Sequence, residues 1–214
     1  MNCRALSLLE GAYIASDDEI TIEVCKEFIP STSAGLFDRD GDTHYCLLGA
    51  LQKSIRGSDP DAAVFYLARL LEGGDIISAC RRLLVIASED VGLAYPQAAQ
   101  ITYALCETAR QLGMPEARIP LSSCAIMLAT APKSNSAEAA IDMALGDIRG
   151  GKGTFFPLHL QAPLFKGYKY PHDYPNHFVK QQYLPDDLVG KQYYKYGENK
   201  TEQAAKAYWD NIKK

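Results

Sequence analysis

Three absences narrow the function of this chain. Its 214 residues contain no apolar run of the length, about 18 residues or more, that a membrane-spanning helix requires. They contain neither a Gly-x-x-x-x-Gly-Lys-Ser/Thr loop nor a Gly-x-Gly-x-x-Gly turn after a strand, the usual cradles for nucleotide phosphates. No Cys-x-x-Cys pair occurs among the six cysteines, so we expect no zinc site; they are Cys3, Cys25, Cys46, Cys80, Cys106 and Cys124.

Composition favours a folded protein in a reducing, cytoplasmic compartment. Hydrophobic residues make up 47% of the chain, enough for a proper core. Most cysteines stand at apolar positions of helical stretches, where a free thiol behaves as a small hydrophobic group. The chain enters a helical pattern at its first residues, so we expect it to be part of a longer protein.

Apolar residues recur with the helical period along most of the chain, whereas sustained alternation typical of a strand does not occur. We predict helices over about 3–15, 21–28, 41–56, 60–72, 76–87, 95–112, 115–130, 136–149 and 201–213. Short loops rich in Gly and Pro separate the middle six, which predicts an all-α fold with a compact helical bundle. Residues 31–35 are predicted to form a linker.

Some helix ends and faces can be specified further. Asp59 is predicted to cap a helix whose first residue is Pro60. Asn135 and Glu138 have the spacing of a capping box. The helix after Tyr95-Pro96 is expected to bury the stripe Ala98, Ile101, Leu105, Thr108 and Leu112.

Candidate catalytic and metal-binding groups are few. The run Gly-Gly-Lys-Gly at 150–153 follows a helix, which favours a helix end over a phosphate loop. His172, Asp173 and His177 suggest metal binding or acid–base chemistry, and a free-standing helical enzyme built on them is one alternative. Pro171 and Pro175 argue against a helix that would align the two histidines. We therefore predict no catalytic residue, no metal site and no cofactor in this chain.

The last quarter of the chain differs in composition. Residues 166–214 carry nine Lys against six Asp/Glu and hold eight of the thirteen tyrosines and the only tryptophan. Interleaved aromatic and basic side chains can stack bases and hold phosphates, but they can equally wrap a bundle or contact another subunit. Candidate DNA contacts are Arg81, Arg82, Lys169, Tyr170, Lys180 and Tyr183.

Six sequence motifs, in order along the chain, resemble the C-terminal region of the RarA/MgsA family of AAA+ ATPases. This family includes the Werner-helicase-interacting proteins. The motifs are Asp-Arg-Asp-Gly-Asp-Thr-His-Tyr at 38–45, Ser-Ile-Arg-Gly-Ser-Asp-Pro-Asp-Ala-Ala at 54–63, Ala-Ser-Glu-Asp-Val-Gly-Leu-Ala at 87–94, Ala-Pro-Lys-Ser-Asn at 131–135, Tyr-Lys-Tyr-Pro-His-Asp-Tyr-Pro at 168–175 and Gln-Gln-Tyr-Leu-Pro-Asp at 181–186. Residues 3–10 resemble a late lid helix of clamp-loader-type AAA+ proteins.

The resemblance implies a division of the chain and a role. Residues 1–33 would end an AAA+ lid, 34–153 would form a helical collar for oligomerisation, and 154–214 would form a tail whose terminal helix packs on the collar. In the family's Gly-Asp-Ala-Arg-Arg-Ala-Leu lid sequence the first arginine senses nucleotide. By register Arg4 matches the second arginine and Cys3 stands in place of the first, so Arg4 is the nucleotide-sensing candidate only as the neighbour of the family's sensing position. The segment between Leu160 and Gly167 is shorter than in relatives.

What the family does is then an expectation for this chain. Members are DNA-dependent ATPases of the clamp-loader clade that act at stalled replication forks, form homo-tetramers and bind DNA, with single-strand-binding protein as a partner. ATP and Mg²⁺ would be used by a motor domain upstream, so we expect no enzymatic activity here. The leading hypothesis is a tetramerisation and lid module, and the alternative is a DNA-binding module that acts through the Tyr/Lys-rich tail.

Overall fold

The computed structural model describes residues 42–163 and 165–213, together with residues 10, 13, 14, 16, 20, 21 and 24. Arg4 and most of the predicted lid segment, residues 1–33, lie outside the described residues, as do the predicted linker at 31–35 and most of the predicted helices over 3–15 and 21–28. In the described ranges every regular element is helical, which confirms the all-α prediction.

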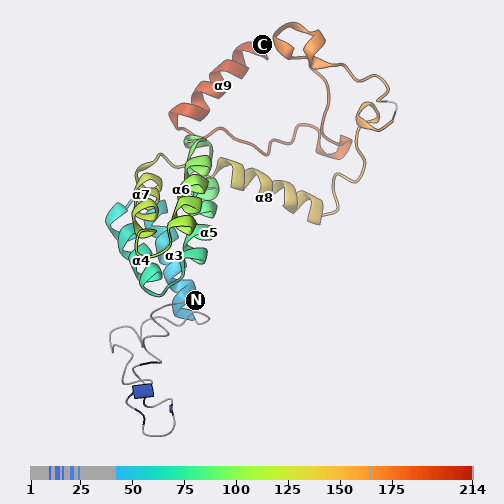
Figure 1. The fold of residues 1–214 in the computed structure, drawn as a ribbon. Coiled ribbons are helices and arrows are strands. Elements are labelled where there is room, and N and C mark those ends of the chain that lie inside the picture. Colours follow the sequence, from blue (N-terminus) through green and yellow to red (C-terminus); the bar gives the residue numbers. More distant parts are fainter. Residues whose placement is uncertain are drawn as a thin grey trace.

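Five helices form the bundle: α3 (Asp42–Arg56), α4 (Pro60–Glu72), α5 (Ile76–Ile86), α6 (Ala98–Leu112) and α7 (Arg118–Thr130). A π-helical turn, η1 (Ala87–Val91), and a 3₁₀ turn, η2 (Gly92–Ala94), link α5 to α6. Helix α4 packs on α3 and α7, while α6 packs on α7 and α5 (Figure 1). The largest fully buried side chains come from all five helices and include Leu51, Ile55, Leu67, Leu70, Leu83, Ile86, Thr102, Cys106, Leu121 and Leu128.

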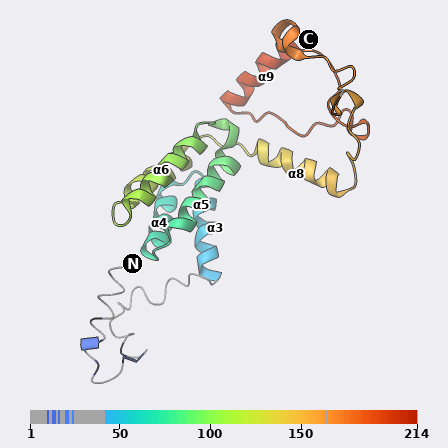
Figure 2. The same ribbon diagram turned by 45° about the vertical axis from the view of Figure 1, so that its right-hand side comes forward.

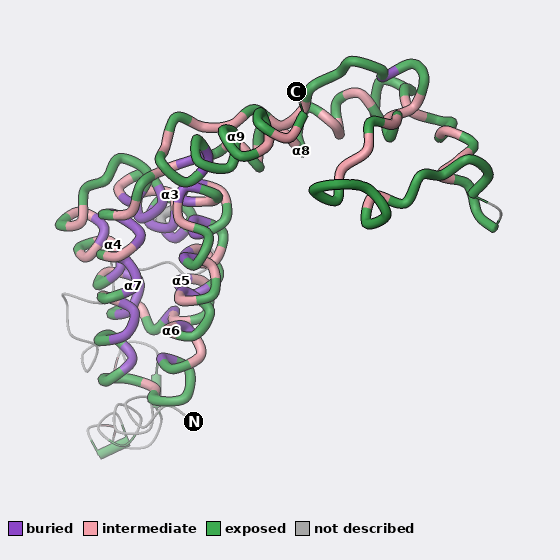
Figure 3. Tube along the Cα trace, turned by 90° about the horizontal axis from the view of Figure 1, so that it is seen from above, coloured by how far each residue is buried: buried purple, intermediate pink, exposed green. Residues whose placement is uncertain are grey.

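Two helices lie outside this core. Helix α8 (Ser136–Arg149) leaves the end of the bundle, and α9 (Lys200–Ile212) returns to that end after a long tail (Figures 1 and 2). Between them the tail has only the short 3₁₀ turns η3 (Leu158–Leu160), η4 (Pro171–Asp173), η5 (Pro175–His177) and η6 (Asp186–Leu188) in its described residues. Burial is concentrated in α3 to α7, and α8, α9 and the tail are mostly exposed (Figure 3).

The start of α4 agrees with the sequence-based prediction, whereas the start of α8 differs from it in one respect. The side chain of Asp59 accepts a hydrogen bond from the backbone N–H of Ala62 at 2.9 Å, and Pro60 is the first residue of α4, as predicted. The capping box at Asn135 was wrong, because the Asn135 side chain makes no cap hydrogen bond. Asn135 has φ −98° and ψ 18°, outside the extended region that a capping residue adopts.

The predicted face of α6 was correct at Ala98 but wrong further along the helix. The buried side chains are Ala98, Thr102, Cys106 and Ala109, whereas Leu112 is 53% exposed and Thr108 is exposed. Small side chains let α6 approach α5 and α7 closely, and the larger Ile101 and Leu105 lie at the edge of the contact. Size complementarity with Leu121 and Leu128 of α7 therefore decides the face more than hydrophobicity does.

This part of the core also holds three of the cysteines. The Sγ atom of Cys106 lies 3.8 Å from the carbonyl oxygen of Cys80, and Sγ of Cys124 lies 3.6 Å from Oγ1 of Thr102. Hydrogen bonding with Cys124 and Cys80, and burial, raise the pKa of the Cys106 thiol. Cys106 is therefore kept protonated and unreactive in the core.

The α6 face can be tested by substitution. Ala109→Leu should lower the free energy of unfolding by about 1–3 kcal/mol, because it overfills a site with no free volume. Leu112→Ala should change it by less than about 0.5 kcal/mol, because Leu112 is largely in solvent. Urea unfolding followed by circular dichroism measures both, and an equal cost for the two substitutions would contradict the observed face.

Candidate functional site

Several of the family-like sequence motifs meet at the end of the bundle where α8 begins. Asp90 of η1 is buried and accepts hydrogen bonds from Arg56 Nε and, at 3.2 Å, from Gln52 Nε2. Arg56 also bonds Glu89 at 2.7 Å, and the carbonyl of Asp90 accepts the backbone N–H of Ser134 at 2.8 Å. This network fixes the α7–α8 loop against α3 and η1.

Gly92 makes the close approach possible. Its φ is +47°, and a Cβ at this position would lie 2.5 Å from the carbonyl oxygen of Ser134. Any other residue would have to push the loop before α8 away from the bundle. Nearby, Lys133 donates to the carbonyls of Ala129 and Ala131 at 2.8 and 2.6 Å, which satisfies the C-terminal end of α7. Burial lowers the pKa of Lys133.

Glu202 of α9 completes this junction. It is 2% exposed and is the only buried residue among the 13 of α9, all of which the structure describes. Its carboxylate accepts hydrogen bonds from Ser134 Oγ at 2.5 Å and Ser136 Oγ at 2.6 Å, across 68 and 66 residues of sequence. It also accepts from the hydroxyl of Tyr194 at 2.9 Å, the backbone N–H of Gly197 at 3.1 Å, and Asn199 Nδ2.

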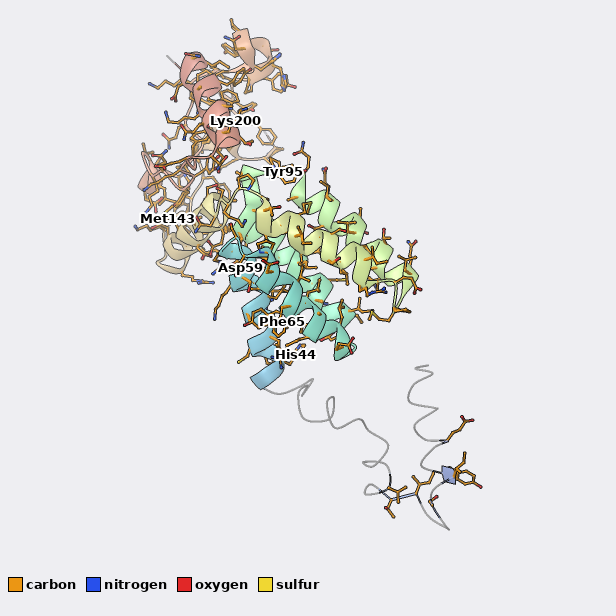
Figure 4. All side chains as sticks on the ribbon, turned by 90° about the vertical axis from the view of Figure 1, so that its left-hand side faces the viewer. His44, Asp59, Phe65, Tyr95, Met143 and Lys200 are labelled. Carbon is orange, nitrogen blue, oxygen red and sulfur yellow. The ribbon has the colours of Figure 1, made fainter. Side chains whose placement is uncertain are left out.

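These donors determine the charge state of Glu202. Burial raises the pKa of its carboxyl, but the hydrogen bonds from Ser134, Ser136, Gly197 and Asn199 outweigh burial and lower the pKa to about 2. A carboxylate at this position thus holds the start of α9 to the start of α8. Thr201 adds a 3.0 Å hydrogen bond to the carbonyl of Ala94, and Lys200 and Tyr95 mark the two sides of the contact in Figure 4.

A second carboxylate ties α8 to the tail. Asp147 bonds Lys191 Nζ at 2.9 Å, Lys152 Nζ at 3.1 Å and the hydroxyl of Tyr193 at 3.0 Å. The hydrogen bonds from the two lysines lower its pKa to about 2. Tyr193 and Tyr194 are adjacent in extended backbone, so one reaches α8 and the other reaches Glu202. Lys152, in the predicted helix end at 150–153, is thereby a partner of Asp147.

Helix α8 itself is unusual. None of its 14 residues, all of them described, is buried. Ala137, Ile141, Leu145 and Ile148 nonetheless follow the spacing of one helical face. Ile141 is 56% exposed and Ile148 is 63% exposed. Beyond the helix, Phe155, Phe156 and Leu158 are also exposed.

The structure brings together most of the tail's candidate DNA contacts. The side-chain amide of Gln181 accepts the backbone N–H of Lys169 at 3.2 Å and donates to its carbonyl at 2.8 Å. The same amide donates to the hydroxyl of Tyr183 at 2.8 Å. This pairing places Lys169, Tyr170 and Tyr183 in one patch, with Lys180 next in sequence to Gln181.

Histidines adjoin this patch. The ring of Tyr170 lies 5.0 Å from that of His172, which lies 4.9 Å from that of His177. The structure thus brings together two histidines that the sequence did not align. Among the described residues, however, no group of three potential ligands could hold a metal ion.

Arg81 and Arg82 lie elsewhere, on α5 within the bundle. Arg82 donates to Gln52 Oε1 at 2.7 Å and so belongs to the Asp90 network. Arg81 is exposed. Helix α5, which carries both arginines, and the tail segment 168–183 are well separated in Figures 1 and 2, so the six predicted DNA contacts do not form one surface. In the described part of the chain, no helix is long and apolar enough to cross a bilayer.

Sequence reasoning missed Glu202, Ser134, Ser136 and Asp147. One signal was present: Asn199 and Glu202 have capping-box spacing, and the Asn199 side chain does accept the backbone N–H of Glu202 at 3.0 Å. That spacing predicts a helix start. It could not predict that the same carboxylate would bond two serines nearly 70 residues away.

A helical bundle that gathers the family-like sequence motifs at one end defines a class of domain, the helical C-terminal domain of an AAA+ ATPase. A family described as MgsA AAA+ ATPase C terminal matches residues 57–213. The chain is 49% identical over 98% of its length to Replication-associated recombination protein A of Bacillus subtilis, covering 53% of that protein.

Two further relatives agree. The chain is 42% identical over 90% of its length to an uncharacterised AAA domain-containing protein of Mycobacterium tuberculosis, covering 45% of it. It is 38% identical over 88% of its length to Replication-associated recombination protein A of Coxiella burnetii, covering 44% of it. The chain belongs to the MgsA C-terminal family, and it spans about half the length of these curated relatives.

The Glu202 junction yields a pH prediction. An unfolded glutamate has a pKa near 4.5, so its lowered folded pKa stabilises the attached tail above about pH 4.5, and this stabilisation is lost as pH falls toward 2. Glu202→Gln should weaken attachment of α9 by about 1.5–3 kcal/mol at pH 7, because it removes a charge that several donors face.

The only tryptophan in the chain, Trp209, lies in α9, so its fluorescence reports on this attachment. Glu202→Gln should flatten the change in fluorescence between about pH 4.5 and pH 2, the range over which the parent chain loses this stabilisation. Glu198→Gln, a matched control at an exposed glutamate, should leave the profile of the parent chain unchanged. Identical profiles for all three proteins would contradict the role of Glu202.

Proposed function

We propose that this chain is a self-assembly module, a homo-tetramer, of a replication-associated recombination ATPase. The observation that carries the proposal is α8, a helix of 14 residues with an apolar face and no buried residue among them. An apolar stripe on a helix is stable in water when another surface covers it. A second copy of the chain supplies such a surface without any additional partner.

The contacts of the tail also support self-assembly through α8. Glu202 and Asp147 hold the tail and α9 against α8 through polar groups, so the apolar side chains of α8 are left for another partner. Exposed Phe155, Phe156 and Leu158 extend the apolar surface past the end of α8. Contiguous exposed apolar surface on a folded domain is typical of a subunit interface.

A role in assembly rather than in ATP hydrolysis follows from the same contacts. The one Gly-rich run with a lysine, at 150–153, closes α8, and Lys152 is engaged with Asp147. We infer that ATP and Mg²⁺ act in a motor domain of the whole protein, at replication forks and on DNA, with single-strand-binding protein among its partners. Nucleotide sensing by Arg4 and a cytoplasmic location belong to this proposal.

Assembly can be measured by light scattering and native mass spectrometry of the full chain over a range of concentrations. We expect a tetramer. Ile141→Asp combined with Ile148→Asp should raise the dissociation constant by about 100-fold or more, because each buried isoleucine contributes about 1.5–3 kcal/mol. A monomer at all concentrations in the parent chain would overturn the proposal.

Met143 provides the control for that experiment. It lies on the opposite face of α8, about 200° around the helix from Ile141, and its position is labelled in Figure 4. Met143→Asp introduces one negative charge into the same helix, which matches the single variant Ile141→Asp, and it should leave assembly intact. Equal loss of assembly in both variants would mean that charge on α8, rather than its apolar face, is responsible.

A second function, binding of single-stranded DNA, is favoured by the Gln181 pairing. It gathers Lys169, Tyr170 and Tyr183 into one exposed patch, which offers aromatic rings for bases and cations for phosphates. The patch belongs to the tail, so DNA binding and assembly through α8 can occur together.

Charge reversal tests this second function. Lys169→Glu with Lys180→Glu should weaken binding to a single-stranded oligonucleotide by about tenfold or more and reduce the slope of log K against log salt by about 1.4. Fluorescence anisotropy measures both, and Lys195→Glu, at an exposed lysine elsewhere in the tail, is the control. Equal binding by all variants, or no binding at low salt, would exclude the patch.

A further inference from the structure

The outer face of α5 is a second unpartnered stripe. Ile77, Arg81, Leu84, Val85 and Ser88 follow helical spacing and point away from the buried Cys80 and Leu83 face. Ile77 is 52% exposed and Val85 is 44% exposed. The stripe is apolar except at Arg81, which places a single positive charge near its centre, and at Ser88 of η1, where it ends.

The two unpartnered stripes meet. A cavity of about 550 Å³ opens between α5 and the first turns of α8, and its apolar wall comes from Leu84, Val85, Ala137 and Ile141. The α8 face continues outward from this cavity through Leu145 to Ile148. The α5 face continues in the other direction to Ile77. Apolar side chains of both helices thus form a groove at this cavity. Ser88, Glu89 and Glu138 also line it, and Arg81 interrupts the α5 face between the groove and Ile77.

We propose that this groove binds α8 of a second copy of the chain, and that the contact is reciprocal. In a two-fold pair the same surface serves on both subunits, so α8 of each copy lies against α5 and α8 of the other. This inference rests on the proposed self-assembly and specifies the surface that carries it.

Charge complementarity identifies α8 as the occupant. Glu138 and Asp142 border the apolar face of α8, while Arg81 interrupts the apolar face of α5. Among the described residues, no carboxylate lies within ion-pair distance of Arg81 and no cation lies within that distance of Asp142. Docking α8 on the partner's α5 buries apolar side chains against apolar side chains and gives Arg81 an acidic neighbour.

The proposed contact pairs Arg81 of one copy with Asp142 of the other, in both directions. Such a pair at the edge of an apolar interface sets orientation and register, and replacing it by two like charges opposes association. The register can therefore be tested through these two residues alone. Both are exposed in the single chain, so their substitution should leave the fold intact.

The experiment uses Arg81→Asp and Asp142→Arg in the full chain, separately and mixed. Each single variant should associate about tenfold or more weakly than the parent chain, measured by native mass spectrometry. An equimolar mixture should recover association as heteromers, because each Arg81→Asp copy then faces an Asp142→Arg copy and the reverse contact keeps its original pair. Circular dichroism checks that each variant is folded.

The outcomes separate this inference from the proposed function. If the parent chain assembles but the variants assemble equally well, or the mixture does not recover, the α5–α8 groove is not the interface, although self-assembly stands. A chain that carries both substitutions completes the comparison. If that chain recovers association and the mixture does not, the pair forms within one chain and the reciprocal contact is excluded. A monomeric parent chain overturns the proposed function itself.

Discussion

A single buried carboxylate, Glu202, joins α9 to the loop before α8 and so holds the C-terminal helix to the end of the bundle. Two serines before and at the start of α8, a tyrosine of the tail and a backbone N–H all donate to it. A Cβ at Gly197 would lie 2.6 Å from Glu202 Oε2, so a larger residue at this position would have to displace the carboxylate. Because Glu202 is the only buried residue of α9, this helix is attached by hydrogen bonds to charge rather than by an apolar face.

The consequence is a molecule with a packed half and an open half. Helices α3 to α7 bury their apolar faces against one another, and the Asp90 network fixes the loop from which α8 departs. Helix α8 and the tail are positioned by polar contacts with Glu202 and Asp147, and they keep apolar side chains in solvent. Exposure of these apolar side chains to water is unfavourable in an isolated chain. The proposed second copy buries them by covering α8. Membership of the MgsA C-terminal family agrees with a role in a larger ATPase.

Much of the bundle could be predicted from sequence, because local rules decide it. Asp59 and Pro60 start α4 where the capping chemistry requires, and α6 ends at Leu112, as its predicted range does. The face of α6 could not be read from hydrophobicity, since the close approach to α5 and α7 favours Thr102 and Ala109 over Leu112. Local sequence patterns could not predict the junction between α8 and α9. Asn135 has the spacing of a helix cap but forms no cap hydrogen bond. Asn199 and Glu202 do form a helix cap, and Glu202 also bonds residues far away in sequence. The lysines and tyrosines of the tail were recognised as a group, but Gln181, which brings them together, has no local signature.

Hydrogen exchange of α8 as a function of protein concentration tests the central claim, that α8 is covered by another copy, most directly. Backbone amides of Ser136–Arg149 should exchange rapidly in dilute solution and become protected as concentration rises through the association range, while amides of α4 should exchange at a constant slow rate. Protection of α8 that does not change with concentration, in a chain shown to associate over the same range, would contradict the account.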